Sequence, residues 1–267
     1  MKLILSLFPG IDLLGRGFEA EGFCVVRGPD LLFGQDVRGF HVPAGKFEGV
    51  IGGSPCQDFS GERRTAPTGN GEAMLKEFAR LVREAAPDWW LLENVPRVPD
   101  VAVVGYTVQR IHISAREAGV RQLRWRCFQF GHRDAAPLVI RRRVTPADVT
   151  APACLAVEGS RKERRDWSTF CTLQGLPPDF ELPGWSRALK YRVVGNGVPI
   201  PLGRMIARAI RDRAENVRAR CVTRVCACGC AREVTGKWKT ATATCRKRLE
   251  RRRKKAPVTD RALASLA

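Results

Sequence analysis

The sequence predicts an α/β fold in which a largely parallel β-sheet carries helices on both faces, followed by a small Cys-rich appendage. One observation is that short apolar runs, each ending at turn residues, alternate with segments whose apolar residues recur at helical spacing. Such alternation is typical of parallel sheets. The other is that five of the ten cysteines cluster after residue 220, in a segment rich in Arg and Lys. We therefore expect one sizeable domain and one short appendage.

Each expected strand is a short apolar run. The first, within MKLILSLFPG, is too short for a signal peptide and lacks a small-residue cleavage site, so we interpret it as a buried strand. The expected strands cover residues 2–8, 24–26, 49–51, 89–92, 106–113 and 125–131, and the last two are expected to pair as a hairpin at the sheet edge. The expected helices cover residues 13–20, 73–86 and 201–213. Between residues 132 and 165 there is no clear periodicity.

The charge points to a polyanionic partner. The net charge is +19, and residues 211–267 hold 17 Lys and Arg against 5 Asp and Glu, a net of +12 that leaves +7 for the first 210 residues. Contacts of Lys and Arg with phosphates release condensed counterions and so favour nucleic acid. The tail therefore reads as an electrostatic anchor. The alternatives are a merely solvated tail and a membrane-surface tail, and the second is disfavoured because no lipidation motif or apolar anchor lies nearby.

The expected location is the cytoplasm of a bacterial or phage-infected cell. No run of about 18 apolar residues is present, which argues against a transmembrane helix. Without a signal peptide the compartment is expected to be reducing. We then expect the scattered cysteines to be small buried apolar residues, unless neighbouring residues indicate a function. An isolated cysteine is usually unreactive.

Polar residues follow three of the expected strands. Phe8-Pro9-Gly10, Ser54-Pro55-Cys56-Gln57 and Glu93-Asn94 stand where strands end. In open α/β sheets ligands bind at the carboxyl ends of the strands, so these groups should converge on one cleft. Asp30 lies 20 residues after Gly10 at another strand end, where an acidic side chain can bind a ribose hydroxyl.

Five motifs together resemble the DNA cytosine-C5 methyltransferases. They are GGSPCQDFS at 52–60, LLENVP at 91–96, VRQLRWRCFQFG at 120–131, FCTLQGLPPDF at 170–180 and VVGNGVPIP at 193–201. They stand in the family's order and cover roughly residues 1–213. The resemblance implies a Rossmann-like S-adenosylmethionine-dependent methyltransferase fold with a reduced target-recognition insert, and a role in DNA methylation and restriction-modification.

The resemblance also assigns roles to the catalytic residues. Cytosine C5 is not nucleophilic enough to take a methyl group unaided, and a Cys56 thiolate adding to C6 would activate it. Glu93 is implied as the acid at N3. Arg126 would contact the base at O2, Arg124 would orient the site, and Gln122 would order the backbone. The target base must leave the duplex stack.

The cofactor implied is S-adenosylmethionine. Asp36 in GQDVRGF would meet its adenine amino group. The residues implied to bind the cofactor are Leu7, Phe8, Gly10, Ile11, Asp12, Asp30, Asp36, Pro55, Met74 and Asn196. The chain departs from the family pattern at Ser6, where Asp is usual, at Arg121, where Pro is common, and at Gly197, where Ser is usual.

Double-stranded DNA is the expected partner of a monomeric chain. The residues expected to contact it are Gln57, Ser60, Gln122, Arg246, Lys247 and Arg248. The Gly-rich segment 61–71 suits a mobile loop that closes over DNA. Only a short stretch, residues 132–169, separates the Arg124 strand from the motif at 170–180, so sequence recognition should be short or relaxed.

The domain boundaries follow from these motifs. We expect a catalytic core at 1–131, a reduced target-recognition region at 132–190 and a closing motif with a helix packed on the core at 191–213. A basic Cys-rich tail completes the chain at 214–267. The small size suggests a compact, phage-like member.

The tail carries a metal-binding hypothesis. Cys226, Cys228, Cys230 and Cys245 resemble a zinc knuckle, because four thiolates can hold zinc tetrahedrally. The spacing is not C-x-x-C, and Ala241 stands where a further cysteine is expected. The alternative is a set of free thiols in a basic tail.

Two other functions stay open. One is the RNA-methylating branch of the same family, whose usual sequence is not apparent here. The other is a DNA-binding protein that keeps the scaffold without activity. The presence of Cys56, Glu93 and Arg126 together argues against the second, since binding alone does not need all three.

Overall fold

The computed structural model describes residues 2–61, 66–134, 136–146, 148–221, 223–228, 230, 232–235, 239–240 and 242–255. The chain divides into two compact units, residues 1–210 and residues 211–267. Each unit is described by itself.

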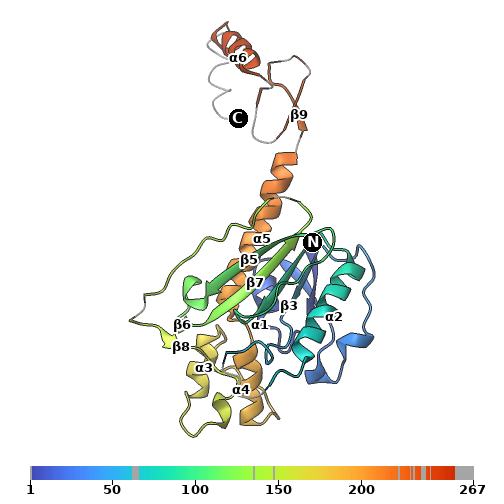
Figure 1. The fold of residues 1–267 in the computed structure, drawn as a ribbon. Coiled ribbons are helices and arrows are strands. Elements are labelled where there is room, and N and C mark those ends of the chain that lie inside the picture. The colour runs from blue at the N-terminus through green and yellow to red at the C-terminus, as the bar shows by residue number, and fades with distance from the viewer. Residues whose placement is uncertain are drawn as a thin grey trace. The chain divides into compact units, whose positions relative to one another are not determined.

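A six-stranded sheet forms the centre of the first unit (Figure 1). Its spatial order is β2-β1-β3-β4-β7-β5. The first four strands in this order run parallel, and β7 runs antiparallel to both β4 and β5. The strands are β1 (Lys2–Leu7), β2 (Phe23–Arg27), β3 (Gly49–Gly52), β4 (Trp89–Asn94), β5 (Thr107–Ser114) and β7 (Trp125–His132).

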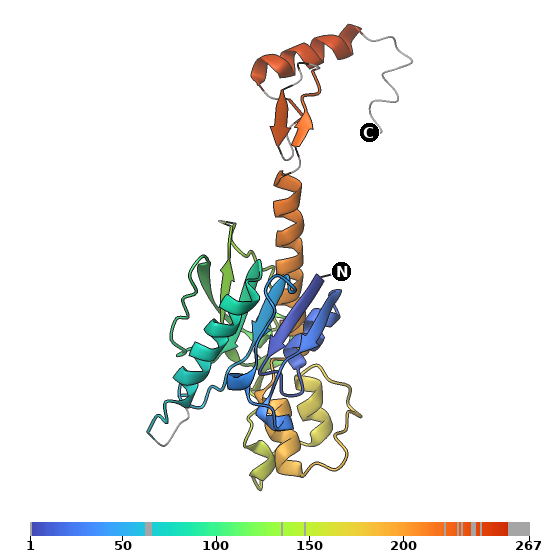
Figure 2. The same ribbon diagram turned by 90° about the vertical axis from the view of Figure 1, so that its right-hand side faces the viewer.

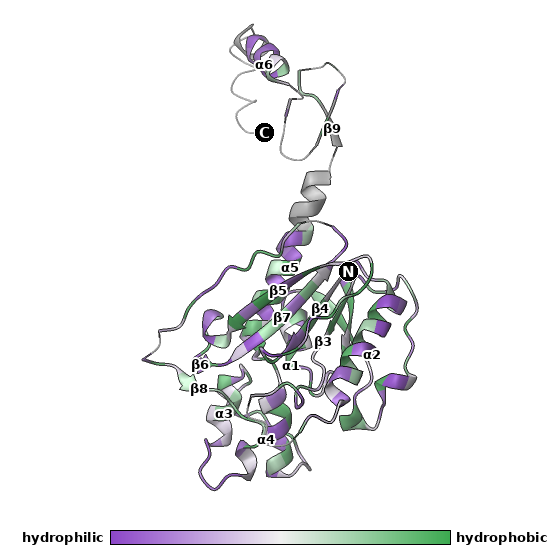
Figure 3. Cartoon of the chain, in the orientation of Figure 1, coloured by the Kyte–Doolittle hydropathy of each residue, from purple (hydrophilic) through white to green (hydrophobic). Residues whose placement is uncertain are grey.

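Helices cover both faces of this sheet (Figure 2). On one face, α1 (Leu13–Glu19) and the start of α5 (Ile200–Cys221) pack on the strands through residues such as Phe18 and Ile206. The other face carries α2 (Asn70–Ala85), whose Phe78 and Leu81 are fully buried. Figure 3 shows the apolar colouring of the strands between these layers.

The helices α1 and α5 approach closely at Gly17. A Cβ atom on this residue would lie 2.8 Å from the backbone nitrogen of Arg204, so a side chain there would push the helices apart. Beside this contact, Arg204 Nε and Arg208 Nη2 lie 3.1 and 2.8 Å from the buried carboxylate of Glu21. The start of α5 is thereby fixed to the core.

A smaller helical layer follows the sheet in the chain. It consists of α3 (Trp167–Leu173) and α4 (Arg187–Asn196), which share an apolar cluster around Phe170 and Tyr191. Two short strands, β6 (Gln122–Leu123) and β8 (Ala151–Pro152), pair in parallel. Single 3₁₀ turns are η1 (Leu31–Phe33), η2 (Val37–Gly39), η3 (Ala115–Glu117) and η4 (Glu158–Ser160).

The expected strands are confirmed, including the antiparallel pair at the sheet edge. Two helices differ from expectation: α2 begins at Asn70 rather than at residue 73, and α5 continues to Cys221 because no breaker follows Arg213. The helices α3 and α4 had not been predicted. Their N-caps were a usable signal, since Asp166 accepts from the Thr169 amide and Ser186 from the Leu189 amide.

The second unit is a short hairpin and a helix. The strands β9 (Thr223–Val225) and β10 (Glu233–Thr235) pair antiparallel, and α6 (Ala243–Lys255) follows. In Figure 3 the described part of α6 is almost wholly hydrophilic. Among the described residues, no helix is long and apolar enough to cross a membrane.

Candidate active site

Cys56 lies on a tight loop at the carboxyl end of β3. The loop begins at Gly53, where a Cβ atom would stand 3.2 Å from Oε2 of Glu93, so a side chain there would crowd this carboxyl group. Cys56 itself is half-buried. Burial raises the pKa of its thiol, the negative charge of Glu93 raises it further, and Arg126 and Arg124 oppose both. The resting group is therefore a thiol held next to a carboxylate.

Glu93 stands at the carboxyl end of β4, the neighbouring strand. Its side chain is 9% exposed, and Oε1 lies 2.8 Å from Nε of Arg126. Burial raises the pKa of this carboxyl, against the attraction of Arg126 and Arg124. A carboxyl with a raised pKa can hold a proton and donate it, which is the property required of a general acid.

Asn94 connects these two loops. Its Nδ2 donates to the backbone oxygen and to Oγ of Ser54, at 3.0 and 3.1 Å, and its Oδ1 accepts from the Val95 amide at 2.8 Å. Asn94 is buried. It therefore fixes the loop that carries Cys56 to the strand that carries Glu93. Sequence reasoning placed Asn94 at a strand end without giving it a role, and the signal was its position directly after Glu93.

Arg124 is buried and binds main-chain oxygens rather than the groups at the strand ends. Its guanidinium donates to the carbonyls of Cys154 and Gly195, each at 2.7 Å. Burial lowers its pKa to about 9. These contacts join the residue before β7 to two later segments of the chain.

Gln122 does not lie where DNA can reach it, which corrects the expectation of a DNA contact. The residue is fully buried. Its Nε2 donates to the carbonyl of Leu173 at 2.9 Å, and its Oε1 accepts from the Cys154 amide at 2.9 Å. Because its polar atoms are used inside the protein, its role is to order the surrounding backbone.

A cavity of about 500 Å³ opens beside these groups, at the carboxyl ends of β1, β2, β3 and β4. All ten residues expected to bind a cofactor line it. Further lining residues that sequence reasoning missed include Leu31, Leu32, Gln35, Asn70 and Arg192. Leu31, Leu32, Gln35 and Asn70 lie in turns or at a helix start, where periodicity gives no signal, and Arg192 lies within α4, which had not been predicted.

The loop after β1 has an unusual backbone. Phe8, Gly10 and Asp12 all have positive φ, at 53°, 53° and 55°. For Phe8 and Asp12 this conformation is costly and persists only where the surroundings impose it, as often happens at binding sites. Asp30 contributes to this constraint, because its Oδ2 accepts from the Gly10 amide at 2.7 Å.

Two further cavity carboxylates, Asp12 and Asp36, also have protein partners. Asp12 accepts from Ser6 Oγ and the Gly15 amide, both at 2.9 Å, and pairs with Arg27 at 3.0 Å, while burial raises its pKa. Hydrogen bonds from Arg38 hold the pKa of Asp36 at about 2. Asp36 is therefore ionised at neutral pH.

The residues expected to contact DNA near the cavity lie on the loop after Cys56. Gln57 is exposed and Ser60 is half-buried. Of the expected mobile loop at 61–71, residues 62–65 lie outside the described residues. Its far end is held by Asp58, which accepts from the amides of Thr68 and Gly71 at 3.0 and 2.8 Å.

A second hollow, of about 550 Å³, lies in the region expected to recognise the target. It combines basic and aromatic side chains with two acidic ones. Its lining residues are Lys162, Arg164, Arg165, Asp166, Trp167, Glu181, Trp185, Arg187, Lys190 and Tyr191. Cation-rich surfaces with aromatic rings suit phosphates and unstacked bases.

In the second unit, the sulfur atoms of Cys226, Cys228, Cys230 and Cys245 lie within 4.8 Å of one another. The three basic residues expected to contact DNA, Arg246, Lys247 and Arg248, are exposed on α6.

Comparison with known proteins agrees with this geometry. A family model described as C-5 cytosine-specific DNA methylase matches residues 34–153, which include Cys56, Glu93, Arg124 and Arg126. Over that segment the chain is similar to this family. The Type II methylase M.HgiDII of Herpetosiphon aurantiacus is 26% identical over 179 residues, which cover 54% of this chain and 50% of the relative.

A second relative, the Type II methyltransferase M.HgiDI of the same bacterium, is 37% identical over 95 residues, covering 32% of this chain and 30% of the relative. The chain thus spans half or less of the length of these relatives. Among solved structures, a candidate DNA modification methyltransferase from an E. coli prophage has a TM-score of 0.61 at 15% identity, covering 80% of this chain and 100% of that one.

The Entamoeba histolytica methyltransferase EhMeth gives a TM-score of 0.60 at 12% identity, covering 79% of this chain and 98% of that one. These likenesses concern the fold. They confirm the expected α/β fold, which these solved methyltransferases share.

Proposed function

We propose that this chain transfers a methyl group from S-adenosylmethionine to C5 of cytosine in DNA, through a covalent bond between Cys56 and C6 of the base. One observation carries the proposal. Glu93, buried and paired with Arg126, stands at a strand end next to the Cys56 loop, and Pro55 and Gln57 on either side of Cys56 line the cavity. A nucleophile and a carboxyl that can hold a proton are the two groups that the reaction needs.

The cavity residues fit S-adenosylmethionine. The cavity volume of about 500 Å³ is in the range of cofactor sites. Apolar groups such as Leu7 and Met74 suit the adenine ring, and Asp30 keeps lone pairs that can accept from ribose hydroxyls. The carboxylates of the lining suit a cation, and Arg192 at the same cavity suits a carboxylate. When bound, the cofactor supplies an electrophilic methyl group on a sulfonium.

The first step is the addition of Cys56 to the base. The Cys56 thiol loses its proton to solvent, the thiolate forms the S–C6 bond, and the electron pair of the C5–C6 double bond moves toward the ring nitrogen N3. Glu93 delivers its proton to N3, which makes C5 enamine-like. Arg126, held against Glu93 at 2.8 Å, orients that carboxyl and can donate to O2 of the base.

The last step releases Cys56. Once C5 carries the methyl group and loses its proton to a base, the S–C6 bond breaks and its electron pair returns to sulfur. The N3 proton returns to Glu93. Asn94 keeps the two residues in register throughout, because it binds the Ser54 loop from the end of β4.

The partner proposed is double-stranded DNA, bound by a monomer. A base in the duplex cannot reach Cys56, so it must be flipped out of the stack. The net charge of +19 and the basic hollow around Lys162 and Arg187 support a polyanionic partner.

The test is covalent trapping on oligonucleotides that contain 5-fluorocytosine. Fluorine at C5 cannot leave as a proton does, so an active chain should remain bound to the base in the presence of cofactor. Cys56→Ser should form no adduct, and Cys24→Ser, which changes a half-buried cysteine on β2, should form it normally. Absence of an adduct with the unchanged chain would reject the proposal and favour a silent DNA-binding protein. An adduct with RNA alone would favour the RNA-methylating branch.

A further inference from the structure

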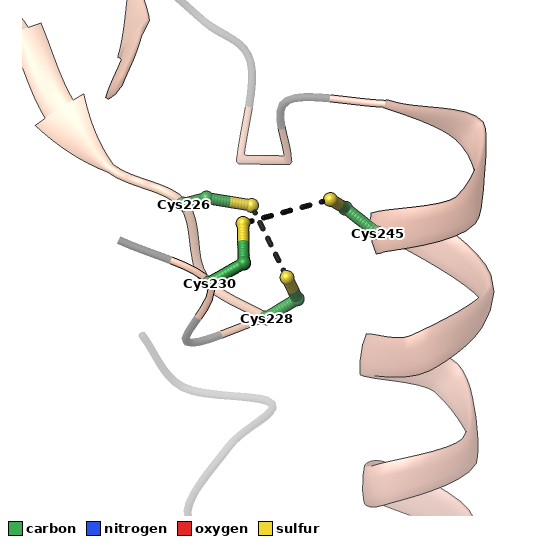
Figure 4. A group of neighbouring side chains, drawn as sticks. All are labelled: Cys226, Cys228, Cys230 and Cys245. Carbon is green, nitrogen blue, oxygen red and sulfur yellow. Dashed lines mark hydrogen bonds between the residues drawn. The ribbon is translucent and has the colours of Figure 1, made fainter. Parts of the chain in front are cut away.

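Four cysteine side chains of the second unit point toward one centre (Figure 4). Cys226 directly follows β9, Cys228 and Cys230 lie in the connection to β10, and Cys245 lies in the first turn of α6. All four sulfur atoms lie within 4.8 Å of one another. Residues separated by up to 19 positions in the sequence thus meet at one point.

The sulfur separations distinguish a metal site from disulfides. The Sγ atoms of Cys226 and Cys228 are 3.5 Å apart, and those of Cys230 and Cys245 are 3.7 Å apart. Sulfur ligands at about 2.3 Å from a tetrahedral zinc ion stand about 3.8 Å from one another. A disulfide requires about 2.05 Å. The observed separations match those expected of ligands around an ion and exclude disulfide bonds within these two pairs.

The backbone around the cluster is held by hydrogen bonds. The Cys226 amide donates to the carbonyl of Arg232 at 2.7 Å, which closes the hairpin around the first three cysteines. At α6, Oγ1 of Thr242 accepts from the Cys245 amide at 3.1 Å and lies 3.2 Å from its sulfur as a donor. A hydroxyl donor and a helix N-terminus both favour a thiolate, the form that binds metal.

The cluster supplies most of the apolar interior formed by the described residues of this unit. Among those residues, the apolar groups that pack with the cysteines are Val234 and the half-buried Leu249. Small domains need disulfides or a metal when their hydrophobic core is small. A cross-link at the cysteines would provide what the core lacks.

We propose that Cys226, Cys228, Cys230 and Cys245 bind one Zn²⁺ ion as four thiolates, and that this ion is the structural centre of the second unit. Four protein ligands fill a tetrahedral zinc site, so no position is open for a substrate and the ion has no catalytic role. Binding releases to solvent the protons that the thiols carry.

The position of the site gives it a consequence for the tail. Arg246, Lys247 and Arg248 follow the ligand Cys245 directly and are exposed. A zinc ion with four thiolates carries two negative charges in excess, which neighbouring cations offset. The ion would fix the start of α6. It would thereby also fix the direction in which the basic side chains of α6 point into solvent.

The test is the metal content of the full-length chain, purified with a thiol reductant and without chelator. Inductively coupled plasma mass spectrometry should find one zinc ion per chain. Cys228→Ser/Cys245→Ser should lose it, and Cys24→Ser should keep it. Replacement by Co²⁺ should give the absorption bands of a tetrahedral tetrathiolate site, which does not depend on the stability of any variant.

Three outcomes would overturn the proposal. One is a chain without zinc that gains none when the metal is added. Another is zinc retained in the double variant. The third is a count of four fewer free thiols than the ten cysteines of the sequence, which would show disulfides. None of these measurements depends on methyl transfer. The zinc site and the proposed activity are therefore tested independently.

Discussion

The Nε atom of Arg126 lies 2.8 Å from Oε1 of Glu93, and both side chains are largely buried. The two residues come from adjacent antiparallel strands, β4 and β7. The pair opposes the effect of burial, which raises the pKa of Glu93, and so keeps a carboxyl that can both hold and release a proton.

Replacing the acid should slow the chemical step. Glu93→Gln keeps the shape of the side chain and removes the proton that reaches N3, so we expect the single-turnover rate to fall about a hundredfold or more. Cofactor affinity, measured by calorimetry, should change little. An unchanged single-turnover rate would remove Glu93 from the proposed role.

The same substitution should lower the pKa of Cys56. Burial is the larger cause of its raised pKa and the charge of Glu93 the second, so a neutral Gln leaves only the first. Thiolate then forms at lower pH. We expect the pH midpoint for alkylation of Cys56 by iodoacetamide to shift downward in Glu93→Gln, as followed by mass spectrometry of the peptide. A midpoint that stays or rises would contradict the assigned charge interaction.

Asn94 should matter for both stability and rate. Asn94→Ala removes two hydrogen bonds to Ser54 and leaves a buried carbonyl without its donor, which costs about 1–3 kcal/mol in the free energy of unfolding. Loosening the Cys56 loop should also lower kcat. Ser54→Ala is the matched control, because it removes only the hydroxyl acceptor and should lower the melting temperature less. Equal effects of both variants would argue against the backbone contact as the important one.

The second unit should add affinity rather than specificity. Since α5 extends to Cys221, a chain ending there keeps the helix whole and lacks α6 with its basic residues. DNA binding should weaken, and the salt dependence should flatten by about 0.9 in logarithmic slope for each phosphate that the shorter chain no longer neutralises. Lys and Arg bound to phosphates do not read bases, so the methylated sequence, mapped by bisulfite sequencing, should stay the same.

Two comparisons extend the truncation experiment. If zinc organises α6, a chelator should reproduce part of the loss of affinity in the full chain and leave the truncated chain unaffected. A changed target sequence after truncation would show that the tail reads bases.

Local sequence was enough to find the strands and the residues at their ends. Cys56 and Glu93 follow short apolar runs, and turn residues mark where each run stops. The bridge from Asn94 to Ser54 could not be predicted in this way, because it depends on the register between β3 and β4, where Gly52 pairs with Leu92. Register is a property of the assembled sheet.

The errors have a related cause. Gln122, Arg124 and Arg126 stand at every second position of one motif, which suggested that they share a function. The burial of Gln122 depends instead on contacts with Leu173 and Gln174, some 50 residues away. The short helices α3 and α4 were not predicted, because each is too short to show a clear helical spacing of apolar residues. Their stability comes from the caps and from packing around Tyr191 rather than from helix propensity.

The chemistry of this site is built at the seam where the sheet changes from parallel to antiparallel. Glu93 faces Phe128 across the β4–β7 ladder, so main-chain hydrogen bonds fix the acid against the strand that carries Arg126. The segment expected to recognise the target begins only after β7 ends at His132. Its length can change by insertion or deletion only away from Cys154, whose main chain binds Arg124 and Gln122 next to the reacting groups. Under the proposed function, target preference can then change through this segment while the pairing of β4 with β7 stays fixed.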